Sequence, residues 1–488
     1  MEPNNPTLGL RNEISLIALF TVLVGSALLG LLFLESKGML YAIGSLIGVF
    51  YIVSIVKFPK FGFYSFYTFT FWMFTLNLYT GLEQTGVLAD AILLINVVCL
   101  SLVKFNEVES NRHAFSHKSV WIWSAWLIIC LGINLLNFEN VSWQSFLYGV
   151  RRFHLNPIGF VILNILVIKT KQDFYHFFKI TGIFLAIAFL VGYRQYYFGF
   201  NSYENALLET SFGETHLIQG SIRYWGAFSD SANYGIAMSF FAIIFSGLAL
   251  IARTTRAKLW NILIAAMSLH HVLISGTRTA FATFGIGFLI FILFYTRGRL
   301  RLISLLSSVF TYLLLKFTWL GNNIDLIRRV RTSFNPDDAS LLLRINNRLL
   351  LENWLTTNPL GGGIGGTLFD RRFAPDTFLS TFPPDGLYTL IKAETGKIGL
   401  YSYNLIMVAI ILYMVIVLLK LKPYGEKKLW MIIILAITLG ARLAEYAQFT
   451  TYQFPTVNLL FFLLIAFEKW ETWQDEQLPV QQDKPPFR

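Results

Sequence analysis

Arginine side chains gather in one long polar segment, residues 321–397, of a chain that is otherwise strongly apolar. A guanidinium presents its N–H donors as a planar fork that matches phosphate oxygens, so clustered arginines indicate an anion site. LLLRINNRLLLENWL (341–355) has an amphipathic helical pattern with Arg344 and Arg348 on one face. We expect this helix to present both arginines to a phosphate. In the alternative interpretation, Glu352 on the same face only pairs with Arg348.

One carboxylate in the same segment is placed to accept a proton. Asp385 follows two prolines in TFPPDGLY (381–388) and precedes a helical pattern that begins at Leu387. An aspartate in front of a helix is a common N-cap, which would explain it without chemistry. A carboxylate beside several arginines also stays ionised and is a candidate general base. The two interpretations are compatible.

Further arginines stand at the edges of apolar runs. Arg278, in SGTRTAF (275–281), is either part of the anion site or a snorkelling anchor at a membrane boundary. Arg223, Arg151 and Arg152 are the other candidates on the same predicted side. Solvated loop arginines remain the alternative for each of them.

Two other motifs give no cofactor site. NPLGGGIGG (358–366) resembles a phosphate-binding loop, but that fingerprint needs a strand before it and a helix after it. We interpret it as a tight backbone turn. His270 and His271 lie in an apolar run with no Cys or carboxylate at ligand spacing, so we predict no metal site.

The elements that must position these residues are membrane-spanning helices. The 488 residues are 55% hydrophobic and 14% charged, whereas soluble domains are about 25% charged. The net charge of +11 comes from short basic clusters between apolar runs, a pattern that orients membrane helices and does not indicate nucleic-acid binding. Cys99 and Cys130 lie inside apolar runs and are interpreted as small hydrophobes. We predict an all-α polytopic membrane protein with the lipid bilayer as a partner and no nucleic acid.

A membrane span needs about 20 apolar residues, and the chain offers about fourteen such runs. We expect the helix of the short sixth run to begin earlier, around Phe146. The runs lie near residues 14–34, 39–56, 62–81, 87–104, 119–137, 157–169, 178–198, 234–252, 258–275, 279–296, 300–320, 398–421, 428–446 and 455–468.

The Lys and Arg clusters fix the predicted orientation. When the spans alternate, the short basic loops all fall on one side, which the positive-inside rule makes cytoplasmic. The chain is then a single membrane domain, 1–488, with both termini and the tail 469–488 in the cytoplasm. Two long loops, 200–233 and 321–397, lie on the outer side. The basic loops are KFPK (57–60), KTK (169–171), RTTRAK (253–258), RGRLR (297–301) and KPYGEKK (422–428).

Four segments in this order resemble the O-antigen ligase/polymerase superfamily, bacterial inner-membrane enzymes that use undecaprenyl-pyrophosphate-linked glycans. The resemblance covers about residues 220–410. The segments are SIRYWGAFSDSANYGIAM (221–238), SGTRTAFATFGIGFLIFIL (275–293), RLLLENWLTTNPLGGGIGG (348–366) and DGLYTLIKAETGKIGL (385–400).

The resemblance assigns roles to single residues. Arg278 matches the arginine of the family's small-residue–Ser/Thr–Arg motif, and Arg223 matches the arginine before its Gly–aromatic–Asn stretch. Both would bind the pyrophosphate of the lipid carrier. Family ligases have a His nine residues before the Glu of an E-x-G motif, followed by Asn. Here that Glu is Glu394, and Asp385 and Gly386 stand at the aligned positions, as in the Asp-containing versions found among polymerases.

The resemblance implies a polymerase of O-antigen or exopolysaccharide that works without metal or cofactor at the periplasmic face of the inner membrane. A hydroxyl of an acceptor glycan would attack a lipid-linked donor glycan, with Asp385 as candidate base. An O-antigen ligase with a lipid or protein acceptor is the alternative, and other polysaccharide assembly proteins are candidate partners. The expected substrate contacts are Arg344, Arg348, Arg151, Arg152, Tyr388 and Glu394.

A transporter or flippase of lipid-linked sugars is the alternative of a different class. Such folds carry charges near the membrane midplane, and few charges lie inside the predicted spans. Arg194 lies close enough to the outer end of its span to snorkel. Asp90, Arg442 and Glu445 are candidates to line a cavity, and Arg442 and Glu445 are spaced to pair at i,i+3.

Overall fold

The computed structural model describes residues 47–81, 85–104, 117–137, 141–218, 221–323, 327–328, 331, 339–367, 377–421, 425–449, 452–470 and 473. The predicted span at 14–34 and most of the predicted tail at 469–488 lie outside these residues.

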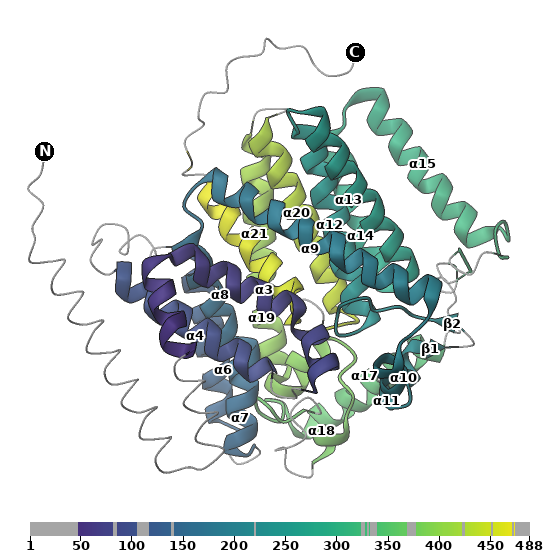
Figure 1. Cartoon of the computed structure of the whole chain (residues 1–488). Helices are drawn as coiled ribbons and strands as arrows, with labels where there is room; N and C mark the ends of the chain where they lie inside the picture. The colour runs from purple at the N-terminus through teal and green to yellow at the C-terminus, as the bar shows by residue number, and fades with distance from the viewer. Residues whose placement is uncertain are drawn as a thin grey trace, which may run out of the picture.

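The described chain is a bundle of long apolar helices, as the composition predicts (Figure 1). Among the described residues, nine helices are long and apolar enough to cross a membrane. The total of fourteen spans stays a prediction. Eight of the nine are α4 (Thr85–Lys104), α6 (Lys118–Leu135), α9 (Lys171–Phe198), α12 (Ser231–Ile251), α13 (Thr255–Ile274), α14 (Arg278–Tyr295), α15 (Gly298–Phe317) and α19 (Leu387–Lys420). The bundle also contains α3 (Pro59–Thr80), α20 (Glu426–Glu445) and α21 (Thr456–Trp470).

The ninth of these helices is made of three consecutive pieces. These are α7 (Trp143–Val150), the π-helical turn η2 (Arg151–Leu155) and α8 (Asn156–Val167), which together form a 25-residue apolar helix. The early start predicted around Phe146 is confirmed. In η2 the N–H of Asn156 donates to the carbonyl of Arg151 five residues back. Such π-turns insert one extra residue into a helix and are common at functional sites.

The helix ends that the basic loops place on one side do meet in space. The Lys60 ammonium at the start of α3 pairs with Asp173 at the start of α9. The Lys469 ammonium at the end of α21 donates to the carbonyl of Ile165 near the end of α8, at 2.6 Å. The alternation of spans is therefore consistent with these contacts, and the cytoplasmic assignment of this side stays a prediction.

Helix α12 is the centre of the bundle, and most of its side chains are buried. It packs against α13, α14 and α20. Small residues let the backbones approach closely, as in other membrane helix pairs: a Cβ added to Gly235 would lie 2.4 Å from the Ser275 hydroxyl, and one added to Gly287 would lie 2.3 Å from Ile243. By contrast, α15 buries none of its residues and stands apart at the edge of the bundle (Figure 1).

The predicted outer loops contain structure of their own. The first holds α10 (Ser202–Leu208), α11 (Ser211–His216) and a two-residue antiparallel pair, β1 (Leu217–Ile218) with β2 (Ser221–Ile222), the one small departure from an all-α chain among the described residues. The second holds α17 (Ala339–Thr357) and α18 (Phe378–Thr381). Helix α12 begins at Ser231, and α19 begins at Leu387, where the sequence pattern predicts a helix; the outer-side boundaries of both loops stay predictions.

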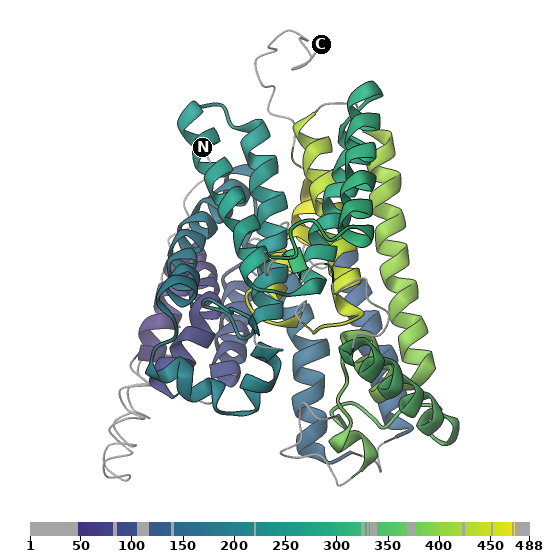
Figure 2. The same cartoon turned by 90° about the vertical axis from the view of Figure 1, so that its right-hand side faces the viewer.

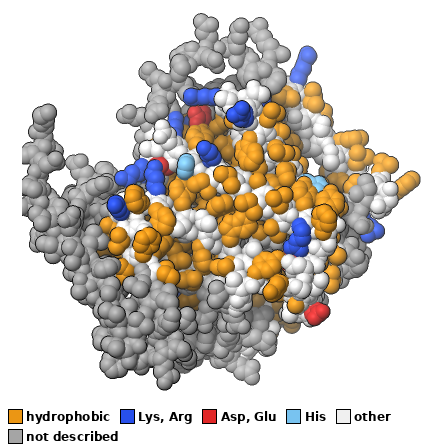
Figure 3. All heavy atoms as spheres, viewed as in Figure 1, with side chains coloured by type: hydrophobic (Ala, Val, Ile, Leu, Met, Phe, Trp, Pro, Cys, Tyr) orange, Lys and Arg blue, Asp and Glu red, His pale blue; other side chains and the backbone are white. Residues whose placement is uncertain are grey.

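These loop elements lie at one end of the bundle. Figures 1 and 2 show α17 and α18 beside the first turns of α19, at the same end as α7, α10 and α11. We call this the loop end. Hydrophobic side chains cover most of the described surface seen in Figure 3, as expected for helices that face lipid.

Candidate functional site

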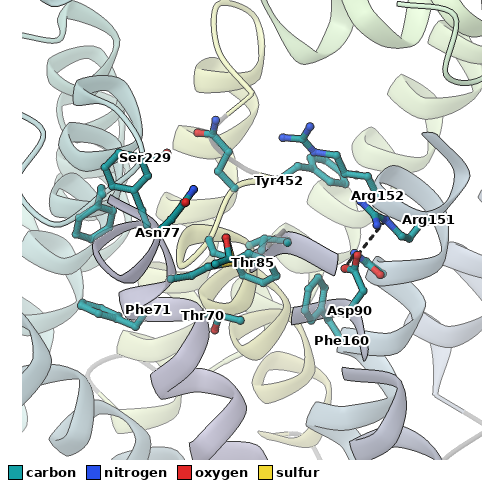
Figure 4. A pocket seen from close by; sticks show the side chains of 18 of the residues that line it. Thr70, Phe71, Asn77, Thr85, Asp90, Arg151, Arg152, Phe160, Ser229 and Tyr452 are labelled. Carbon is teal, nitrogen blue, oxygen red and sulfur yellow. Dashed lines mark hydrogen bonds and ion pairs between the residues drawn. The ribbon is translucent and has the colours of Figure 1, made fainter. Parts of the chain in front are cut away.

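A cavity of about 300 Å³ opens beside the π-turn near the loop end (Figure 4). Arg151 and Arg152 enter it from η2, and Asp90 enters it from α4. We call it the arginine cavity. Figure 4 shows these three charged side chains on one side of the cavity and Asn77 and Ser229 on the other. Its remaining lining residues come from α3, α4, α8, α21 and the segments 227–229 and 452–454.

The charges in the cavity are partly compensated. The Arg151 Nε lies 2.9 Å from a carboxylate oxygen of Asp90, and the guanidinium also covers the ring of Tyr148, 4.6 Å from its centroid. The amide of Asn156 donates to the other oxygen of Asp90 at 2.6 Å. Asp90 thus lines a cavity, as its position inside a span indicated, and it fixes the orientation of one of the two arginines.

Uncharged polar groups complete the lining. Asn77, Thr85, Ser229, Tyr452 and Gln453 are hydrogen-bonding side chains of the kind that recognise sugar hydroxyls. The buried amide oxygen of Gln453 has no hydrogen-bond partner, so an acceptor remains available for a ligand. No sequence pattern indicated Tyr452 or Gln453, since both lie in a short connection between two apolar runs.

The chain segments that carry Arg223 and Arg278 meet at the first residue of α12. The Thr277 hydroxyl, next to Arg278, donates to the carbonyl of Ser231 at 2.9 Å. The N–H of Ser231 donates to His216 Nε2 at 3.2 Å, and the carbonyl of His216 accepts the N–H of Arg223 at 2.9 Å. Two segments that are far apart in sequence therefore meet at one helix start, and a shared role of their arginines stays a prediction.

The same helix start adjoins the arginine cavity. Asp230 caps α12 by accepting the N–H groups of Ala232 and Asn233, both at 2.8 Å. Ser229, one residue earlier, lines the cavity. Burial lowers the pKa of His216, which keeps its Nε2 available as an acceptor for Ser231.

Helix α17 docks on the loop-end terminus of α20 through Arg348. Its guanidinium donates to the carbonyl of Tyr446 at 2.9 Å and to the hydroxyl of the same residue, and lies 3.8 Å from its ring centroid. Arg344 lies half-buried on the same helix. Glu352 pairs with Lys392 and Lys397. This contradicts the interpretation in which Glu352 neutralises Arg348.

Asp385 does not cap α19, and this expectation is wrong. The N-cap residue is Gly386, and no side chain caps this helix. The half-buried carboxylate of Asp385 accepts instead from the amide of Asn347 on α17, at 2.9 Å. The physical reason is the close approach of the chain to α20: a Cβ on Gly386 would lie 2.7 Å from the carbonyl oxygen of Tyr446. Asp385 is thereby attached to α17 at Asn347, the residue before Arg348.

The glycine-rich segment 358–367, called here the glycine loop, is a tight turn as predicted. Glu394 is only 4% exposed, and its carboxylate accepts from the N–H of Gly365 at 3.1 Å and from the hydroxyl of Thr367 at 2.9 Å. The N–H of Ile364 donates to the side chain of Asn134 at 2.8 Å. In this structure Glu394 therefore anchors the loop, and its contact with substrate stays a prediction.

The predicted i,i+3 pair inside α20 is confirmed. The guanidinium of Arg442 lies 2.5 Å from the Glu445 carboxylate and donates to the Tyr403 hydroxyl at 2.5 Å. Tyr388, a predicted substrate contact, is half-buried beside Tyr403, with their ring centroids 6.0 Å apart. This cluster ties the first turns of α19 to the loop-end half of α20.

Tyr452 connects these parts. It lines the arginine cavity, a small cavity beside Arg442 and Glu445, and a third, water-sized cavity beside His154 and Glu394. His154 is 4% exposed and its Nδ1 has no hydrogen-bond partner. The π-turn therefore sends two arginines into one cavity and a histidine into another, which a simple apolar pattern does not reveal.

No family model matches this chain, and no curated protein matches it. Among the described residues, no three His, Cys, Asp or Glu side chains lie close enough together to hold a metal ion.

Proposed function

We propose that the protein is a membrane glycosyltransferase that polymerises a bacterial cell-surface polysaccharide, O-antigen or exopolysaccharide, from undecaprenyl-pyrophosphate-linked glycans at the periplasmic face of the inner membrane. The observation that carries the proposal is the cavity lined by Arg151 and Arg152 between apolar helices. The arginines can bind a phosphate, the apolar side chains can bind a lipid, and the uncharged polar side chains can bind sugar hydroxyls. A glycan linked to a lipid through a pyrophosphate has all three groups.

The chemistry joins one glycan to another. A hydroxyl oxygen of the acceptor glycan attacks the anomeric carbon of the donor, and a new glycosidic C–O bond forms. The bond between that carbon and the pyrophosphate oxygen breaks, and undecaprenyl pyrophosphate leaves with the electron pair. The hydroxyl proton passes to the Asp385 carboxylate, which Asn347 holds at the loop end.

The arginines supply the electrostatic stabilisation of the leaving group. Negative charge grows on the leaving pyrophosphate as the bond breaks, and donors already fixed in place stabilise that charge without reorganising. Arg278 and Arg223 are assigned to the donor pyrophosphate, as the family resemblance implies, and the segments that carry them meet at the start of α12. Arg348 attaches α17 to Tyr446 at the end of α20. Asn347, the preceding residue, holds the carboxylate of Asp385, the candidate base.

A ligase would use the same donor and the same groups with a lipid or protein acceptor, so it remains the alternative. A transporter is favoured by one specific observation: the arginine cavity lies between spans and contains the charge pair of Asp90 and Arg151. It would bind lipid-linked sugars without forming a glycosidic bond.

The test uses the full-length protein, purified in detergent and incubated with lipid-linked repeat units of its host. Wild type is expected to give a ladder of longer lipid-linked glycans, which Arg278→Ala and Asp385→Ala lose while their elution profiles stay those of a folded protein. Arg256→Ala is the matched control, an exposed arginine at the start of α13. Transfer of a single glycan to an added lipid or protein would make the protein a ligase. Binding of substrate with no product from any acceptor would contradict a transferase.

A ladder that survives Asp385→Ala would remove the carboxylate from the proton transfer and leave it a contact of Asn347.

A further inference from the structure

Polymerisation of lipid-linked glycans brings two pyrophosphates to one enzyme, one on the donor and one on the acceptor. The arginines near the loop end fall into separate groups. The segments that carry Arg223 and Arg278 meet at the start of α12 through hydrogen bonds of Thr277, Ser231 and His216. Arg151 and Arg152 line the arginine cavity, and neither Arg223 nor Arg278 is among its lining residues. Two groups of guanidiniums for two pyrophosphates is the arrangement that such a reaction requires.

We propose that the arginine cavity is a second pyrophosphate subsite, which holds the pyrophosphate of the lipid-linked acceptor. This inference rests on the proposed function and adds to it a place for the second substrate. The cavity volume of about 300 Å³ lies at the lower end of the range for small-molecule sites, about 300–1,000 Å³, so it suits a headgroup better than a whole glycan.

The charge of the cavity fits an acceptor better than a donor. Its charged lining residues are Arg151, Arg152 and Asp90, so two positive charges and one negative charge leave a net charge of +1. A donor site must stabilise charge that grows as the bond breaks. The acceptor pyrophosphate keeps its charge throughout the reaction and must leave afterwards with its lengthened glycan. A site with a lower net positive charge binds such a group with moderate affinity, so that the product can dissociate.

Asp90 is the residue that sets this balance. Its carboxylate lies 2.9 Å from the Arg151 Nε and is itself held by the amide of Asn156. With Nε facing Asp90 and the guanidinium covering Tyr148, the Arg151 plane has a fixed direction. Asp90 therefore acts as a positioning residue that orients one guanidinium and lowers the charge of the subsite.

The apolar wall distinguishes a lipid-linked anion from free phosphate. Phe71, Phe74, Phe160 and Val457 line the cavity together with the arginines, and Figure 4 shows Phe71 and Phe160 beside it. A free anion gains nothing from these side chains, whereas the first carbons of a polyprenyl chain would bury apolar surface against them. The ligand class is therefore a polyprenyl pyrophosphate.

The first test measures binding to the full-length protein in detergent by calorimetry, without turnover. Wild type is expected to bind undecaprenyl pyrophosphate at two sites, and Arg152→Ala and Arg278→Ala should each weaken binding at one of the two sites and leave the other unchanged. Loss of a charge-assisted hydrogen bond should weaken the affected site about ten- to a hundredfold. Asp90→Asn, which keeps a hydrogen-bonding amide, should bind more tightly than wild type. Inorganic pyrophosphate should bind the same sites more weakly.

Two sites with wild-type affinity in Arg152→Ala would overturn the proposal. Inorganic pyrophosphate that binds as tightly as the lipid would also overturn it. Arg256→Ala, with the same loss of charge away from the cavity, must behave as wild type.

The second test separates the two substrates kinetically. Arg152→Ala should raise the KM for a lipid-linked acceptor about tenfold or more and leave the KM for a free oligosaccharide acceptor unchanged, because only the former carries a pyrophosphate. An equal loss with both acceptors would mean a merely structural role and would overturn the assignment. A protein that binds two lipid pyrophosphates but makes no glycan would leave the subsite standing and reject the glycosyltransferase.

Discussion

Glu204 shows how a single buried carboxylate ties the first outer loop to a span. It is 1% exposed, accepts two hydrogen bonds from Arg194, each at 2.5 Å, and a third from Gln195 at 2.8 Å. The N–H of Asn201 adds a fourth at 2.9 Å. Arg194 was expected only to snorkel from its span, and the structure gives its charge a partner in the loop. The loop position therefore depends on the ionised form of Glu204.

This carboxylate should make the stability of the protein sensitive to acid. Burial alone would raise the pKa of Glu204, but the hydrogen bonds from Arg194, Gln195 and Asn201 outweigh burial, and the pKa lies below its ordinary value. A depressed pKa gives stability that is present above the ordinary value, about 4.3, and is lost as the pH falls through the folded-state value.

We expect the unfolding temperature of wild type to fall between about pH 5 and pH 3, and that of Glu204→Gln, less stable at pH 7, to fall less. The measurement is thermal unfolding in detergent over that range. Equal pH dependence of the two proteins would contradict a stabilising role for the ionised carboxylate.

At the scale of elements, the backbone of the glycine loop packs directly against the backbone of α7. Gly365 has a φ of +84°, and a Cβ there would lie 2.0 Å from the carbonyl oxygen of Ser145 on α7. Gly149 closes the same contact from α7, where a Cβ would lie 2.7 Å from the N of Gly365. Both α7 and the loop are thus held at a spacing that only glycine permits.

Gly365→Ala should therefore destabilise the folded protein by at least about 2 kcal/mol, from the strained φ and the clash with Ser145. The matched control is Gly132→Ala in α6, where a Cβ would have nothing within 4 Å. The yield of monodisperse protein and its unfolding temperature after purification measure both variants. Comparable stability of the two would show that the loop is not packed as described.

The sequence predicted the helices better than their irregularities. Long apolar runs fix the existence of a span, because length and hydropathy alone decide it. The π-turn at Arg151–Leu155 has no such signature, since its residues read as a continuation of the same helix. Asp385 failed as a predicted cap for a similar reason. Its partner Asn347 is distant in sequence, and local patterns carry no information about such contacts.

For the whole molecule, the prediction that matters most is orientation. Thr356 on α17 and Arg256 at the start of α13 are both exposed, and the alternation of spans places them on opposite sides. In a background with Cys99→Ser and Cys130→Ala, Thr356→Cys should react with a membrane-impermeant maleimide in cells whose outer membrane is permeabilised. Arg256→Cys should react only after lysis.

The reverse pattern would place the arginine cavity and Asp385 toward the cytoplasm and would remove the support for a periplasmic reaction.

The length of helix α19 and the position of its break indicate how deep the loop end lies in the bilayer. A straight helix of its 34 residues would be about 51 Å long, far more than the hydrocarbon thickness of about 30 Å. The chain breaks it at Gly396, whose φ is +66°, and the part that follows, 397–420, is about 36 Å long. That part alone suffices to cross the lipid. We expect the break to lie at the level where acyl chains give way to headgroups, and the chemistry proposed here would then take place at the height of the lipid phosphates themselves.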